Sequence, residues 1–138
     1  PEPFDPAFTP EVLWANLRRR SVRVKTNLLS QRPVAGVGNI YADEALWRAG
    51  IHPAARAISR PAAARLHAAL LEVLTAGIEH GGTTLRDYRG VDGSTGSNQL
   101  HLACYGRAGQ PCPRCGATFR RSVVDGRGTT HCPLCQRR

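Results

Sequence analysis

Residues 112–135 read CPRCGATFRRSVVDGRGTTHCPLC, a segment with two Cys-x-x-Cys pairs that stand sixteen residues apart. Each pair places two thiolates on one side of a metal, and four soft sulfur ligands at tetrahedral corners suit zinc with no open position for water. The intervening residues predict a β-hairpin that turns at residues 125–128. Because so small a hairpin buries little apolar surface, its folding should depend on the metal. The sequence therefore predicts one structural zinc ion, held by Cys112, Cys115, Cys132 and Cys135.

The cysteines could also bind iron or act as a redox dithiol, but their arrangement disfavours both. Iron and a redox dithiol are the alternatives, because a single Cys-x-x-Cys can be redox-active. Cys104 lies outside the quartet, and we expect a small buried hydrophobe there rather than a reactive thiol. Five cysteines in this arrangement favour a metal over disulfides, and a reducing cytoplasm over the exterior. No stretch is long and apolar enough to cross a bilayer, and nothing resembles a secretory signal, so we expect no membrane partner.

The charge balance points to a polyanionic partner. The chain has 19 Lys and Arg against 10 Asp and Glu, a net charge of +9, which attracts nucleic acid. Lys25 is the only lysine, and the planar arginine fork holds phosphate oxygens in pairs. A codon bias would also explain the missing lysines, but not the net charge. In the hairpin, Arg127 is expected in the turn and directed outward, whereas other arginines there could instead neutralise the zinc thiolates.

Most of the remaining chain predicts helix. The proline-rich residues 1–8 read as a linker, after which Thr9 and Pro10 begin a helix that ends near Arg20. A second helix is expected from about 39 to 49, and a third opens at residues 59–61 and stops at the glycines 81–82. The third helix carries one apolar stripe, consisting of Leu66, Leu70, Val73, Leu74, Gly77 and Ile78.

The segment that follows the third helix changes character. Residues 83–98 have almost no apolar anchors, which predicts a long exposed loop, and residues 100–105 are compatible with a strand. The expected fold class is mainly α with a small β zinc ribbon. The predicted units are a linker (1–8), a helical domain (9–98) and a zinc-finger hairpin (99–138).

Three groups of residues in the helical part invite a chemical interpretation. Gly36 and Gly38 precede a helix and leave free N–H groups that can hold a phosphate, although Asn39 also reads as an ordinary helix cap. Lys25 could form a Schiff base, but a surface charge is the favoured reading. Asp43 and Glu44 are neighbours on a helix, point about 100° apart and do not form a facing carboxylate pair.

Several motifs occur in an order that resembles the formamidopyrimidine-DNA glycosylases. They are GVGNIYA at 36–42, GIHP at 50–53, GGTTL at 81–85 and YGR at 105–107, followed by the cysteine quartet. The resemblance covers nearly the whole chain. It implies a helix–two-turn–helix bundle followed by a zinc finger, as in the C-terminal half of an enzyme that removes oxidised purines and nicks the strand. Residues 50–53 and 81–84 favour this branch over the endonuclease VIII relatives.

The resemblance also implies roles for individual residues. Asn39, preceded by Gly38, matches the asparagine that binds backbone phosphate near the lesion, and Arg127 matches the zinc-finger arginine on the same strand. Tyr105 matches a tyrosine near the DNA surface. The loop that covers an extruded base corresponds to residues within 83–98, namely Gly93, Ser94, Thr95, Gly96 and Ser97. Extrusion fits the chemistry, because the bond to be cut is unreachable in a stacked duplex.

The resemblance further implies that the catalytic N-terminal β-sandwich is absent here. The family's nucleophile is an N-terminal proline amine, and Pro1-Glu2 looks like a false match because the next residues resemble the linker into the helical domain. We therefore expect no catalytic residue in this chain, which would bind double-stranded DNA with oxidised bases or abasic sites, as a monomer, without turnover. The alternatives are a zinc-ribbon module that binds RNA or protein, and a chain that is catalytically complete through Pro1.

Overall fold

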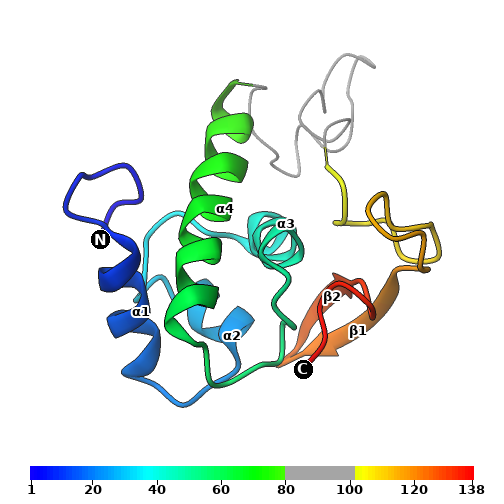
Figure 1. The fold of residues 1–138 in the computed structure, drawn as a ribbon, viewed down its shortest axis with the longest axis horizontal. Helices are drawn as coiled ribbons and strands as arrows, with labels where there is room; N and C mark the ends of the chain where they lie inside the picture. Colours follow the sequence, from blue (N-terminus) through cyan, green and yellow to red (C-terminus); the bar gives the residue numbers. More distant parts are fainter. Residues whose placement is uncertain (80–101) are drawn as a thin grey trace.

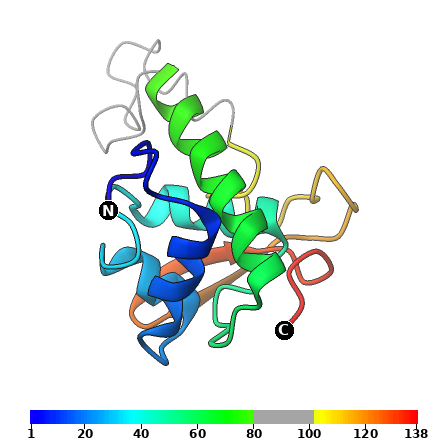
Figure 2. The ribbon, with the colours of Figure 1, turned by 60° about the vertical axis from the view of Figure 1, so that its left-hand side comes forward.

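The computed structural model describes residues 1–79 and 102–138. In order, its helices are α1 (Pro10–Arg18), α2 (Val24–Leu29), α3 (Asn39–Ala49) and α4 (Arg60–Glu79), and its strands are β1 (Arg120–Val124) and β2 (Arg127–His131). The fold class predicted from the sequence is therefore confirmed. Figure 1 shows α3 end-on between α4 and the hairpin, and Figure 2 shows α4 passing in front of α3.

The helix ends follow from local chemistry. Thr9 caps α1, because its Oγ1 accepts a hydrogen bond from the N–H of Val12, and Pro10 occupies the first helical position. Gly50 ends α3 in the left-handed conformation, with φ of 71°, and the Ser59 hydroxyl accepts from the N–H of Ala62 at the start of α4. These are the boundaries that the capping residues predict.

Two hydrophobic clusters hold the described residues together. The larger joins all four helices, including Leu13, Leu28, Leu46 and Leu70. The smaller lies beside the cysteines and is made of Trp47, Cys104, Cys112, Phe119 and Cys132. Trp47 comes from α3 and the other four come from the C-terminal segment, so α3 contributes to both cores.

Four expectations about local structure are wrong. The sequence did not predict α2, which is only six residues long and has no side-chain cap. Ile78 is 72% exposed and lies off the buried stripe of α4, whereas the other members of that stripe are buried. Residues 103–105 form bends and a turn, so the described part of the expected strand 100–105 is not a strand, whereas residues 100 and 101 lie outside the described residues.

The hairpin turn is shorter than the expected turn at residues 125–128. Only Asp125 and Gly126 form it, with φ of 47° and 82°, as in the two-residue type I′ turn that matches the twist of the strands. Arg127 is instead the first residue of β2, where it pairs with Val124.

Candidate nucleic-acid interface and zinc centre

The cysteine quartet has the geometry of a zinc site. The Sγ atoms of Cys112, Cys115, Cys132 and Cys135 all lie within 4.8 Å of one another. The Sγ–Sγ distances are 3.9 Å for Cys112 and Cys135 and 3.4 Å for Cys115 and Cys132, against about 3.8 Å for sulfurs around tetrahedral zinc. The residues therefore fit one structural zinc, as predicted. The four thiolates would fill the tetrahedral positions around such an ion and leave it no open site for catalysis.

The thiolate form needed for metal binding is favoured at one ligand. Burial opposes ionisation of Cys112, but the backbone N–H groups of Cys115 and Arg114 and the indole N–H of Trp47 outweigh it and lower the thiol pKa to about 6. Cys104 is the opposite case. Burial, followed by the carboxylates of Glu44 and Asp43, raises the pKa of its thiol. Cys104 is completely buried, as the sequence predicts, and has no thiolate character at neutral pH.

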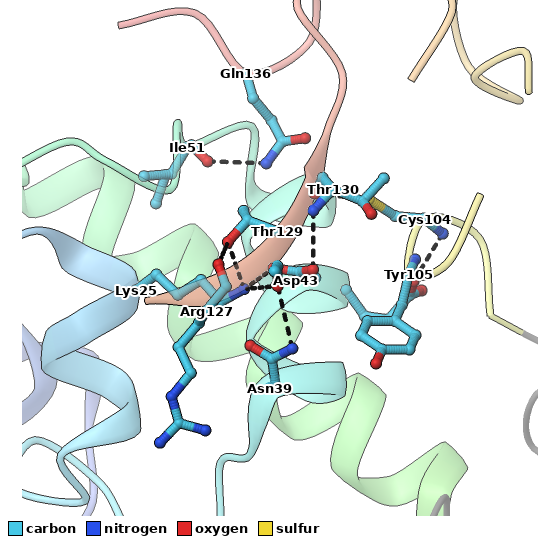
Figure 3. Close-up of polar contacts among 12 residues, drawn as sticks. Lys25, Asn39, Asp43, Ile51, Cys104, Tyr105, Arg127, Thr129, Thr130 and Gln136 are labelled. Atoms are coloured by element: carbon cyan, nitrogen blue, oxygen red, sulfur yellow. Dashed lines mark hydrogen bonds and ion pairs between the residues drawn. The ribbon is translucent and has the colours of Figure 1, made fainter. Parts of the chain in front are cut away.

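Asn39 and the residue that follows Arg127 are in direct contact. The Nδ2 of Asn39 donates a hydrogen bond of 3.2 Å to the carbonyl oxygen of Gly128. Asn39 is not the helix cap, because Gly38 occupies that position without a side chain and a Cβ placed there would meet nothing within 4 Å. The first turn of α3 is thus open at Gly38, and the exposed side chain of Arg127 extends away from the protein beside it (Figure 3).

A buried ion pair lies behind this contact. The Nζ of Lys25 is 2.7 Å from the Oδ1 of Asp43, and it donates to the carbonyl of Gly128 at 3.0 Å and to the hydroxyl of Thr129 at 2.8 Å. The other carboxylate oxygen of Asp43 accepts the N–H of Thr130 at 3.1 Å. The expectation that Lys25 is a surface charge is therefore wrong. Through these contacts, Lys25 of α2 connects α3 and β2 (Figure 3).

Burial sets the protonation chemistry of this pair. It lowers the pKa of Lys25 and raises the pKa of Asp43, and the attraction between the two groups opposes both shifts. Both side chains are at most 1% exposed. The buried amine is therefore unavailable to a substrate carbonyl, which removes the Schiff-base reading of Lys25.

Asp125 fixes the other side of the hairpin turn. Its carboxylate accepts from the Nη1 of Arg23 at 3.0 Å and from the hydroxyl of Thr26 in α2. Asp125 lies two residues before Arg127, and the Lys25 contacts are made by the two residues after it. The backbone is therefore restrained on both sides of Arg127. Asp125, the only acidic residue in this arginine-rich hairpin, therefore positions the turn.

Glu44 holds the segment that contains Tyr105. Its two oxygens accept the backbone N–H groups of Ala103, Cys104 and Tyr105, at 2.6–2.9 Å. Asp43 and Glu44 thus bind different segments, in agreement with the prediction that they do not face each other. The half-buried side chain of Tyr105 lies on the other side of the first turn of α3 from Arg127 (Figure 3).

The structure brings Asn39, Gly38 and Arg127 together, with Tyr105 nearby. Gly93, Ser94, Thr95, Gly96 and Ser97, predicted to form the lesion loop, lie outside the described residues. The sequence did not reveal that Lys25, Asp43, Glu44 and Asp125 support this surface. A signal existed for one of them, since a single lysine in an arginine-rich chain is unusual.

Two family models match the chain. The formamidopyrimidine-DNA glycosylase H2TH domain matches residues 1–89, and the zinc finger found in FPG and IleRS matches residues 109–138. Among curated relatives, the formamidopyrimidine-DNA glycosylases of Roseiflexus sp. and Thermomicrobium roseum are 52% and 50% identical. Each match covers 99% of this chain but 50% and 48% of the relative. The chain therefore spans about half the length of the curated relatives it matches.

Solved structures show the same relationship. The MutM (Fpg) protein of Thermus thermophilus is 46% identical with a TM-score of 0.86, over 99% of this chain and 53% of that one. A Lactococcus lactis glycosylase bound to DNA with an AP site is 38% identical with a TM-score of 0.88, over 100% and 50%. A MutM complex with DNA containing carbocyclic 8-oxo-G is 41% identical with a TM-score of 0.88, over 100% and 51%. In the described part of this chain, no helix is long and apolar enough to cross a membrane.

Proposed function

Because the chain belongs to the formamidopyrimidine-DNA glycosylase family, matching its helix–two-turn–helix model over residues 1–89, we propose that it is the DNA-binding part of such an enzyme. The whole protein would remove oxidised purines and cleave the strand at the resulting abasic site. This chain alone would bind damaged double-stranded DNA without turnover. The observation that carries the proposal is the hydrogen bond from Asn39 to Gly128, which places the open start of α3 beside Arg127.

The electrostatics of this surface support a phosphate ligand. The N-terminus of a helix carries a partial positive charge and unpaired N–H groups, and Gly38 leaves that end of α3 uncovered. Arg127 adds a full positive charge on an exposed side chain next to it. A phosphate between the two would receive donors from both domains. The Lys25 and Asp125 contacts hold the two donor sets in a fixed relation, so little ordering would be needed on binding.

In this proposal, the excision chemistry belongs to the half of the related enzymes that this chain does not span. Lys25, the only lysine in the sequence, is buried in an ion pair, and the four cysteines would take all the coordination positions of the zinc. Neither group can attack a sugar carbon. Tyr105 and residues 93–97 are proposed to lie near the DNA and the extruded base. We further propose that the protein acts as a monomer in a reducing bacterial cytoplasm, where its thiolates stay available to zinc.

Fluorescence anisotropy with labelled duplexes tests the proposal. The chain should bind a duplex with a tetrahydrofuran abasic analogue more tightly than intact DNA, and both more tightly than double-stranded RNA. The logarithm of each binding constant should fall linearly with the logarithm of salt concentration. Equal binding of RNA and DNA would instead favour a general zinc-ribbon module. A covalent adduct on abasic DNA after borohydride treatment would show that the chain has its own nucleophile, at Pro1.

A further inference from the structure

One helix residue reaches the metal centre from outside the zinc finger. Trp47 belongs to α3 and is 6% exposed, yet it packs with Cys112 and Phe119 rather than with the helical core. Its indole Nε1 lies 3.4 Å from the Sγ of Cys112, within hydrogen-bond distance for a sulfur acceptor. The ring therefore contributes packing and also directs its only polar group at a zinc ligand.

Arg114 holds the indole in this position. Its guanidinium stacks on the Trp47 ring, 3.8 Å from the centroid, and donates to the carbonyls of Trp47 and Arg48 at the end of α3. Phe119 packs edge-on against the Trp47 ring, at 6.3 Å between centroids. Because Arg114 lies between Cys112 and Cys115 in the sequence, the clamp joins the first cysteine pair directly to α3.

We propose that Trp47 is an outer-sphere ligand of the zinc centre, whose indole N–H withdraws electron density from the Cys112 thiolate and so strengthens and protects the site. A zinc ion with four thiolates carries a formal charge of −2, and N–H donors to sulfur disperse that charge. A hydrogen-bonded thiolate is also a weaker nucleophile towards electrophiles. The proposal concerns the metal centre only and does not depend on DNA binding.

The two cysteines of the first pair differ in burial and in hydrogen bonding. Cys112 is buried and receives the indole N–H, whereas Cys115 is exposed. Within this pair, an electrophile in solution should therefore attack Cys115 before Cys112. The indole protects the ligand that lies against the helical domain, where loss of the metal would also disturb α3.

Trp47→Phe isolates the N–H group, because phenylalanine keeps a ring for Arg114 and Phe119 but has no donor. Zinc affinity, measured in competition with a chromogenic chelator, should fall about tenfold. Zinc release by N-ethylmaleimide should be several-fold faster. In cobalt-substituted protein, the sulfur-to-metal charge-transfer band should move to longer wavelength, because the sulfur electrons are held less tightly. A purely packing role for Trp47 would leave that band in place.

Trp14→Phe is the matched control. Trp14 is the only other tryptophan, and its indole donates to the carbonyl of Ile58 at 3.2 Å, away from the cysteines. This variant should keep the zinc affinity and the cobalt spectrum of the parent. Unchanged affinity and spectrum in Trp47→Phe would overturn the proposal. If Trp47→Phe does not fold, the hydrogen bond can be tested by NMR in the Trp14→Phe chain with cadmium-113 in place of zinc. The indole proton of Trp47 should then show scalar coupling to the metal. A missing coupling would reject the hydrogen bond.

Discussion

Lys25 and Asp43 form an ion pair of 2.7 Å inside the protein, with neither side chain more than 1% exposed. The two residues come from α2 and α3, and the remaining polar atoms of both are directed to the backbone and hydroxyl groups of β2. A desolvated charge pair of this kind is costly when one member is removed, and far less so when both are. The pair therefore couples the two helices to the zinc finger.

Lys25→Met should destabilise the chain by about 3–5 kcal/mol, because it leaves the Asp43 carboxylate buried without a counter-charge. Asp43→Asn should cost less, since an amide oxygen can still accept the N–H of Thr130. Combined with Lys25→Met, it should recover part of the loss, with a coupling energy of roughly 1–3 kcal/mol. Urea unfolding of the four proteins measures the cycle. Energies that add to within about 0.5 kcal/mol would contradict a direct interaction.

The stability of Asp43→Asn should depend on pH in a defined direction. Burial already lowers the pKa of Lys25 below that of the unfolded chain, and removing Asp43 takes away the main group that opposes this shift. The unfolded state then binds the proton more readily, so the variant gains stability as pH rises towards the unfolded pKa and loses it as pH falls through the folded pKa. As pH rises from neutrality towards the unfolded pKa of lysine, the unfolding free energy of the variant should therefore rise relative to the parent.

The same residues show why only part of the site could be predicted. The metal ligands and most helix ends follow from local spacing, because a Cys-x-x-Cys pair or a Thr-Pro cap acts within a few residues. Lys25 is 18 residues from Asp43 and 103 from Gly128, and no local pattern records which distant strand will cover it. Ile78 fits the periodicity of α4 yet is exposed, since periodicity does not say how far the facing surface extends. Likewise, α2 is too short for its pattern to differ from that of a loop.

Asn39→Ala should weaken DNA binding while leaving the fold nearly as stable as before. The carbonyl of Gly128 loses one donor but keeps the Nζ of Lys25, so no buried acceptor is left without a partner. We therefore expect a small fall in melting temperature and a loss of affinity corresponding to about 1–2 kcal/mol, as for one phosphate hydrogen bond. Parallel thermal unfolding and anisotropy titrations separate the two effects. A large loss of stability with unchanged affinity would assign Asn39 a structural role only.

Arg127→Ala should reduce affinity for all duplex sequences and lower the salt slope by about one, because a phosphate contact carries no base information. Arg120→Ala is the matched control. It removes the same charge from the same hairpin, but Arg120 pairs with His131 at the zinc end, away from the turn. If both variants lose affinity equally, the effect comes from net charge and not from a specific contact at Arg127.

Removing zinc should abolish DNA binding and also weaken the helical domain. The apolar cluster beside the cysteines is small and three of its five residues are cysteines, so without the metal the hairpin should unfold and release Arg127. Lys25, Asp43 and Glu44 would then lose their hydrogen-bond partners in residues 103–130, and only the ion pair between Lys25 and Asp43 would remain. After chelation, we expect circular dichroism to show that most of the helix remains, with a lower melting temperature. DNA affinity should become too weak to measure. Both the melting temperature and the affinity should recover when zinc is restored. A helical domain that melts at an unchanged temperature without zinc would show that these buried polar contacts do not transmit stability from the zinc finger to α2 and α3.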